Sequence, residues 1–146
     1  MNQHMNRAMV ALVVGVWPLM SACQQQSKRV EHEQAARVEH VDGSDVARVT
    51  LTQKAIERIG LETGTVEERT MSPAVRIVPY SALIYDAHGD TWVYTSSAPR
   101  SFVRQKVTVD RIAGNDVILA DGPTVGTVIA TVGVAELYGT EFEVGH

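Results

Sequence analysis

Few side chains in this sequence have the types and spacing needed for acid–base or metal chemistry. His88 lies between Asp86 and Asp90, and a histidine flanked by carboxylates occurs both in metal sites and beside general bases. The whole segment 86–90 reads Asp-Ala-His-Gly-Asp, however, and this composition is typical of a tight turn. We therefore predict a turn at this position rather than a catalytic or metal-binding cluster.

No other short motif in the sequence indicates a nucleophile, a phosphate-binding loop or a metal site. The serines at 96, 97 and 101 lack the Gly-x-Ser-x-Gly pattern of a nucleophile elbow, and residues 122–126 lack the Gly-Lys-Ser/Thr ending of a phosphate loop. His32 and His40 end two copies of the tetrapeptide Arg-Val-Glu-His and have no third ligand nearby, which makes a poor metal site. We expect no catalytic residue, no metal and no cofactor, and hence a protein that is not an enzyme.

The single cysteine, Cys23, follows a short apolar segment near the N-terminus. Arg7 precedes the apolar run 8–20, which is shorter than the ~20 residues of a membrane-spanning helix and contains Pro18. A positive start, an apolar run and then the small residues Ser21 and Ala22 are the pattern of a secretory signal. One cysteine also excludes an intramolecular disulfide and a cysteine-only zinc site.

Residues 20–23, Met-Ser-Ala-Cys, resemble the lipobox of bacterial lipoproteins, although the family more often has leucine where Met20 stands. The resemblance implies a signal peptide at 1–22, cleavage between Ala22 and Cys23, and lipid attachment to the Cys23 thiol, which would anchor the chain to a membrane. It places the protein in the cell envelope, facing the periplasm, on the outer or the inner membrane. An ordinary cleaved signal and an uncleaved anchor are the alternatives.

Composition constrains the rest of the chain. A net charge of −4 with 13 lysines and arginines argues against a nucleic-acid partner, which requires a basic surface. Residues 23–45 are polar and lack aromatic side chains, so we predict a flexible tether, with a transient helix that aligns Val30 and Val38 as the alternative. The globular domain is then expected at 46–146.

The hydrophobic pattern of residues 46–146 is mainly that of short strands. Thr52 and Gly60 are suitable caps for a short helix over 53–59, and apolar alternation with turn residues about every ten positions follows. We predict a small antiparallel β domain, barrel-like or sandwich-like, with one short N-terminal helix. A further set of aromatic residues would pack in the core or line a groove: Tyr80, Tyr85, Trp92 and Tyr94.

Three segments in order resemble the periplasmic adaptors, or membrane fusion proteins, of bacterial tripartite efflux systems. Residues 49–63 resemble the opening strand and helix of that family, and 78–94 resemble the entry to its membrane-proximal domain, with Val-Pro-Tyr-Ser-Ala-Leu at 78–83. Residues 102–137 resemble the remainder of that domain. The lipoyl, helical-hairpin and barrel domains that a full adaptor inserts between the first two segments are missing, since Thr63 and Val78 are close together in this chain.

The resemblance implies a lipid-anchored accessory of an efflux transport system. Its expected partner is an inner-membrane efflux transporter or a full-length adaptor subunit. Two alternatives stay open at this point: a periplasmic ligand- or metal-binding module, and a structural envelope lipoprotein, or a remnant, without a transport partner.

Overall fold

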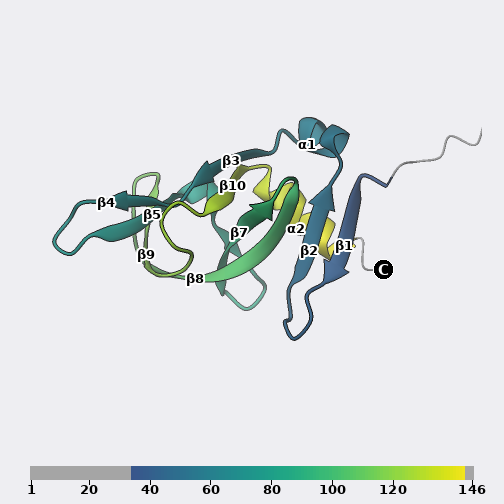
Figure 1. The fold of residues 1–146 in the computed structure, drawn as a ribbon. Helices are drawn as coiled ribbons and strands as arrows, with labels where there is room; N and C mark the ends of the chain where they lie inside the picture. Colours follow the sequence, from purple (N-terminus) through teal and green to yellow (C-terminus); the bar gives the residue numbers. More distant parts are fainter. Residues whose placement is uncertain (1–33, 144–146) are drawn as a thin grey trace, which may run out of the picture. The chain divides into compact units, whose positions relative to one another are not determined.

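The computed structural model describes residues 34–143, and these form a mainly β domain in which 51% of residues lie in strands (Figure 1). The predicted signal at 1–22, the residues Ala22 and Cys23, and the tether up to residue 33 lie outside the described part. Within that part, no helix is long and apolar enough to cross a membrane. The elements in chain order are β1 (Ala36–His40), β2 (Ala47–Leu51), α1 (Gln53–Ile59), β3 (Glu62–Thr65), β4 (Glu67–Arg69), β5 (Val75–Pro79), a 3-10 turn (Tyr80–Ala82), β6 (Ile84–Tyr85), β7 (Thr91–Ala98), β8 (Ser101–Ala113), β9 (Asp116–Asp121), β10 (Val128–Val132) and α2 (Val134–Glu143).

The strands form one curled antiparallel sheet, a half-barrel, in the order β3-β10-β7-β8-β9-β5-β4. The 13-residue strand β8 lies in the middle of this order, and its two halves have different partners: residues 101–103 also pair with β2, which carries β1, and residues 108–113 pair with β9. The prediction of a small, mainly β, antiparallel domain is confirmed. Strand β7 continues to Ala98 and turns at once into β8, with Arg100 at φ 61°.

The prediction of a flexible tether over 23–45 is wrong for its second half. Residues Ala36–His40 form β1, which pairs along its whole length with β2, and Val38 packs on the core rather than aligning in a helix with Val30. The domain therefore begins at least ten residues before the predicted boundary at 46. The polar composition obscured this strand because only Ala36 and Val38 face inward, while Arg37 and Glu39 face solvent.

The predicted N-terminal helix is α1, and its caps are those expected. The Thr52 hydroxyl accepts a hydrogen bond from the Ala55 backbone N–H at 3.2 Å. Gly60 ends the helix with a φ of 61°, a left-handed conformation in which glycine has no steric penalty. Capping at both ends stabilises a helix that is too short to persist alone.

The expectation of a single helix is wrong, because α2 forms a second helix over Val134–Glu143. Its inward side chains Val134, Leu137 and Glu141 follow helical spacing, but the last of them is charged, so the sequence shows no complete apolar stripe. Gly139 inside the helix further weakens the propensity signal. Only Gly133 separates α2 from the apolar strand β10, so the sequence pattern did not distinguish the start of the helix from the end of the strand.

Two cores lie on opposite faces of the sheet. Tyr94 and Ala130 belong to the first core, which α1, α2 and the β1–β2 hairpin cover, whereas their neighbours Val93 and Ile129 belong to the second core inside the half-barrel. All four are fully buried, because successive side chains of a strand point to opposite faces and both faces of β7 and β10 are covered. The first core comprises Ala36, Val49, Leu51, Ala55, Tyr94, Phe102, Ala130, Val134 and Leu137. The second core comprises Val66, Val78, Ala82, Val93, Val107, Val117, Leu119 and Ile129.

Candidate functional site

The predicted turn at 86–90 is present and its polar groups are used to close it. The Asp86 carboxylate accepts hydrogen bonds from the backbone N–H groups of His88 at 2.8 Å and Asp90 at 2.9 Å, and from the Trp92 indole N–H at 3.0 Å. Desolvation is the largest single influence on the pKa of Asp86 and would raise it, but these hydrogen bonds and the nearby His88 together lower that pKa. His88 itself is exposed.

A metal centre does not assemble from the described side chains. Among residues 34–143, no group of three or more histidine, cysteine, aspartate or glutamate side chains is placed to hold a metal ion. His40 ends β1 on the surface, whereas His32 lies outside the described range. Asp90 forms an ion pair with Lys106 at 2.7 Å instead.

The four aromatic side chains of the predicted core or groove separate into three environments. Tyr94 is fully buried in the first core, and Trp92 is half-buried beside the turn at 86–90. Tyr80 and Tyr85 are about half exposed and lie on the surface. They therefore do not line one common groove.

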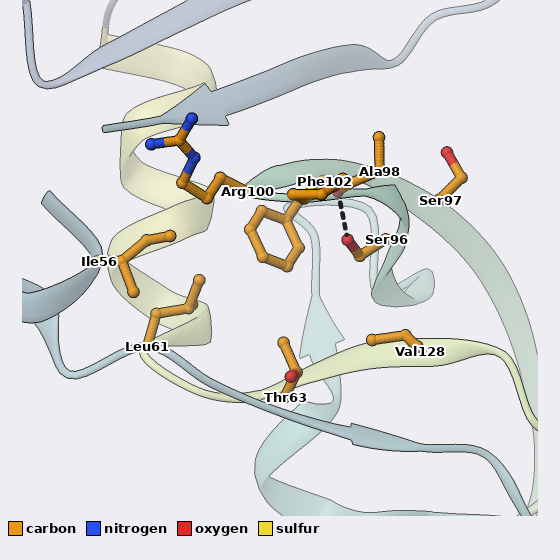
Figure 2. A pocket seen from close by; sticks show the side chains of 10 residues that line it. Ile56, Leu61, Thr63, Ser96, Ser97, Ala98, Arg100, Phe102 and Val128 are labelled. Atoms are coloured by element: carbon orange, nitrogen blue, oxygen red, sulfur yellow. Dashed lines mark hydrogen bonds between the residues drawn. The ribbon is translucent and has the colours of Figure 1, made fainter. Parts of the chain in front are cut away.

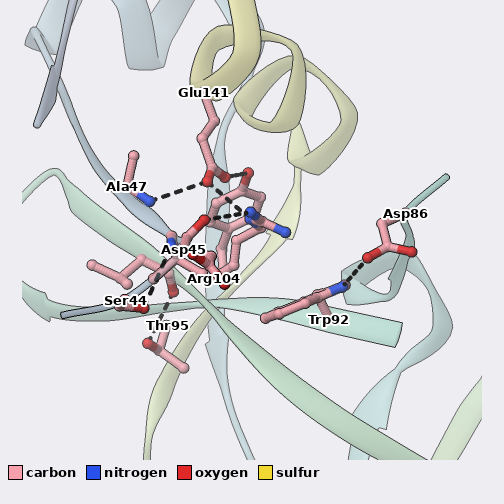
Figure 3. A network of polar contacts seen from close by, with 11 residues as sticks. Ser44, Asp45, Ala47, Asp86, Trp92, Thr95, Arg104 and Glu141 are labelled. Carbon is pink, nitrogen blue, oxygen red and sulfur yellow. Dashed lines mark hydrogen bonds and ion pairs between the residues drawn. The ribbon is translucent and has the colours of Figure 1, made fainter. Parts of the chain in front are cut away.

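A buried polar cluster ties α2 to the sheet, and no sequence motif pointed to it (Figure 3). The Glu141 carboxylate accepts hydrogen bonds from the Arg104 Nε at 2.8 Å, from the Ala47 backbone N–H at 3.2 Å and from the Tyr94 hydroxyl. Arg104 also donates from Nη2 to the Asp45 carbonyl at 3.4 Å. The cluster of Tyr94, Arg104 and Glu141 thereby joins β7, β8, α2 and the start of β2.

The charges of Arg104 and Glu141 are paired with each other, and aromatic side chains surround the pair. The Arg104 guanidinium carbon lies 4.5 Å from the centroid of the Trp92 ring and 5.1 Å from that of Phe142, so aromatic faces cover the cation. Burial, together with the hydrogen bond to Glu141, raises the pKa of Tyr94 well above its usual value. Within residues 34–143, every buried side-chain nitrogen and oxygen has a hydrogen-bond partner.

A cavity of about 460 Å³ lies beside this cluster, lined by Trp92, Phe142 and Lys106 among others. The cations that border it are already paired, Arg104 with Glu141 and Lys106 with Asp90. Arg104 and Glu141 neutralise each other inside the fold, whereas the Lys106–Asp90 pair lies at the surface, so the buried pair fixes the structure around it.

A second hollow, of about 460 Å³, has an apolar floor and opens at the surface (Figure 2). Ile56 of α1 and Leu61 line one side, Val128 of β10 lies across from them, and residues 96–100 of the β7–β8 turn form a rim. The Ser96 hydroxyl donates to the Ala98 carbonyl at 2.9 Å and holds this turn. We call this hollow the α1–β10 groove.

Sequence reasoning missed both the buried cluster and the groove, although one signal for the first was present. Arg104 follows Phe102 at the two-residue spacing of an inward-facing strand position, and a cation there implies a buried partner. The partner, Glu141, is 37 positions away on an element that was not predicted. The groove depends on tertiary contacts between α1, the β7–β8 turn and β10.

Comparison with known proteins gives this chain no family assignment. Neither a scan against protein-family models nor a search of the curated proteins found a match.

Proposed function

We propose that this chain is a non-enzymatic, lipid-anchored periplasmic accessory of a transmembrane efflux system. Its β domain docks, as the membrane-proximal domain of an adaptor would, on an inner-membrane efflux transporter or on a full-length adaptor subunit. The proposal combines the adaptor-like order of the three sequence segments with the way in which the fold assembles them.

The assembly of the first and third segments carries the proposal. Strand β2, from the segment that resembles the opening of an adaptor, pairs with β8, and β3 pairs with β10. Both β8 and β10 come from the segment that resembles the end of the membrane-proximal domain. The pairing of these strands joins into one domain two segments that inserted domains would separate in a full adaptor.

The place at which a full adaptor inserts its other domains is a short hairpin in this chain. After β3, strand β4 turns back into β5, and β5 continues the sheet by pairing with β9 (Figure 1). Among the described residues, nothing resembles the long helical hairpin that reaches an outer-membrane channel. An accessory role therefore fits better than that of a complete adaptor.

The α1–β10 groove is the surface that we assign to docking. Both of its walls come from the adaptor-like segments, since Ile56 and Leu61 belong to the first and Val128 to the third. Val128 is 39% exposed, so an apolar side chain is presented to solvent at the groove's edge.

The docking role is tested by affinity capture of the full chain from crosslinked membranes of cells that naturally produce it. We expect a transporter or a full-length adaptor to be recovered, and the variant Val128→Glu to lose it. Ile112→Glu is the matched control, because Ile112 is a similarly exposed aliphatic side chain (46%) that does not line the groove. Recovery of no transport component would overturn the proposal and favour a structural envelope protein.

The anchor is tested separately by the intact mass of the membrane-extracted protein. The proposal expects a chain that begins at Cys23 and carries acyl groups. An unmodified chain released into the soluble fraction would remove the anchor from the proposal.

A further inference from the structure

Strand β1 has an edge that no other described strand covers. Within residues 34–143 it pairs only with β2 (Figure 1). The hydrogen bonds that flank this ladder run from the Thr52 N–H to the Ala35 carbonyl at 2.9 Å and from the Val41 N–H to the Val46 carbonyl at 3.2 Å. Because hydrogen-bonded pairs alternate along an antiparallel ladder, Arg37 and Glu39 also bond toward β2. The N–H and C=O groups of Ala36, Val38 and His40 therefore point to the open edge.

The side chains of β1 are complementary to a second copy of the same strand. Arg37 and Glu39 lie on the solvent face, with 74% and 44% of their side chains exposed, and their Nη2 and Oε1 atoms are 2.8 Å apart. An antiparallel pairing centred on Val38 places Arg37 of each copy opposite Glu39 of the other. These would be non-hydrogen-bonded pairs, in which facing side chains approach most closely.

The inward face of β1 is equally suited to this arrangement. Ala36 is buried and Val38 packs on the first core. The two-fold pairing brings Val38 against its counterpart, so the apolar faces of the two sheets continue across the junction. An edge strand that carries both charges in a self-complementary order differs from the protected edges of most sheets, where like charges repel a second strand.

We propose that β1 is a dimerisation strand, through which a second copy of this chain joins antiparallel at Val38 and extends the sheet across a two-fold axis. This inference does not rest on the proposed function. A five-residue strand makes a small interface, so the dimer is expected to form in the high-micromolar range in solution. The other candidate for the open edge is the repeat at 29–32, which has the same sequence, Arg-Val-Glu-His, as residues 37–40.

The test uses two charge reversals in the full chain, purified in detergent and examined by sedimentation velocity. Arg37→Glu gives each copy two acidic residues on β1, and Glu39→Arg gives each copy two basic residues. In a dimer of either variant alone, positions 37 and 39 of the two copies would therefore carry like charges opposite each other. Each variant should associate about tenfold or more weakly than the wild type. Mixed together, the two variants face opposite charges at both positions. With an affinity tag on one of them, the untagged variant should copurify as a heterodimer.

Arg111→Glu is the control, because it makes the same change in charge at an exposed position on β8 and should associate as the wild type does. A wild-type chain that stays monomeric through the high-micromolar range would overturn the inference, as would single variants that associate normally or a control that fails to. Association of the wild type without heterodimer formation by the mixed variants would also overturn it.

Discussion

The two cores lie on opposite faces of the same strands but achieve stability in different ways. All eight buried residues of the second core are aliphatic. The first core contains Tyr94 and is bordered by the buried pair Arg104 and Glu141, whose side chains are 8% and 2% exposed. Val93 and Tyr94 are neighbours on β7. Val93 lies in a purely apolar environment, whereas Tyr94 lies in one that includes a hydrogen-bonded charge.

The difference follows from what each core must hold. The second core closes the half-barrel, whose strands β7, β8 and β9 are consecutive in the chain and already hydrogen-bonded to one another. The first core must fix α2 and the β1–β2 hairpin, which come from the two ends of the domain. Glu141 contacts Arg104, Tyr94 and Ala47 together, so one carboxylate attaches α2, which belongs to no backbone ladder, to three strands of the sheet.

The largest expected effect is on the first core, from the change Glu141→Ala. It leaves the buried Arg104 guanidinium without its counter-ion, and we expect the free energy of unfolding to fall by about 3–5 kcal/mol. Urea unfolding measures this value. The double variant Arg104→Met/Glu141→Leu should be distinctly more stable than Glu141→Ala, because it removes both charges. A loss below about 1 kcal/mol for Glu141→Ala would mean that the pair is not buried as described.

Tyr94→Phe has a smaller effect, because it removes only one donor to Glu141. We expect a loss of about 1–3 kcal/mol in the free energy of unfolding at neutral pH. The raised pKa of Tyr94 adds a dependence on alkaline pH. The unfolded chain releases this proton near pH 10 and the folded chain retains it, so the contribution of Tyr94 is complete below pH 10 and declines above it.

Denaturant unfolding from pH 8 to pH 11 tests that dependence. The wild type should lose stability above pH 10, and Tyr94→Phe should lose less over the same interval. Parallel curves for the two proteins would contradict the assigned environment of the hydroxyl.

The second core provides the contrast through Ile129→Val. Removing one methylene from this fully buried side chain should cost about 1 kcal/mol, within the usual range of 0.5–1.5 kcal/mol. The cost should be the same at pH 8 and pH 11, because the second core contains no titratable group. A cost that changes with pH would show that the two cores are coupled.

The smallest effect is expected at the turn 86–90, outside both cores. The lowered pKa of Asp86 means that its ionised form is favoured by the fold, so its contribution is present above the usual pKa of 3.8 and disappears as pH falls through the lowered value. Asp86→Asn should remove this part of the acid dependence, so the variant should be slightly less stable than the wild type near neutral pH and the two proteins should converge toward pH 2. Chemical denaturation from pH 2 to pH 6 makes the measurement, and an unchanged acid profile in the variant would contradict it.

The same contrast explains what the sequence allowed us to predict. Helix α1 and the turn at 86–90 were predicted because Thr52, Gly60, Asp86 and Gly89 act on nearby backbone, and local signals need no knowledge of the fold. Strand β1, helix α2 and the Arg104–Glu141 pair were missed, because each depends on partners far along the chain. A charged residue on the inward face of a helix looks like a solvent-exposed residue until its partner is known.

The central functional claim, docking through the α1–β10 groove, is tested most directly by a photo-crosslinking amino acid placed at position 128 in living cells. We expect an adduct with an efflux transporter or a full-length adaptor, identified by mass spectrometry, and a much lower yield when the same probe replaces Ile112. Equal yields from the two positions, or adducts from position 128 that contain no transport component, would contradict it.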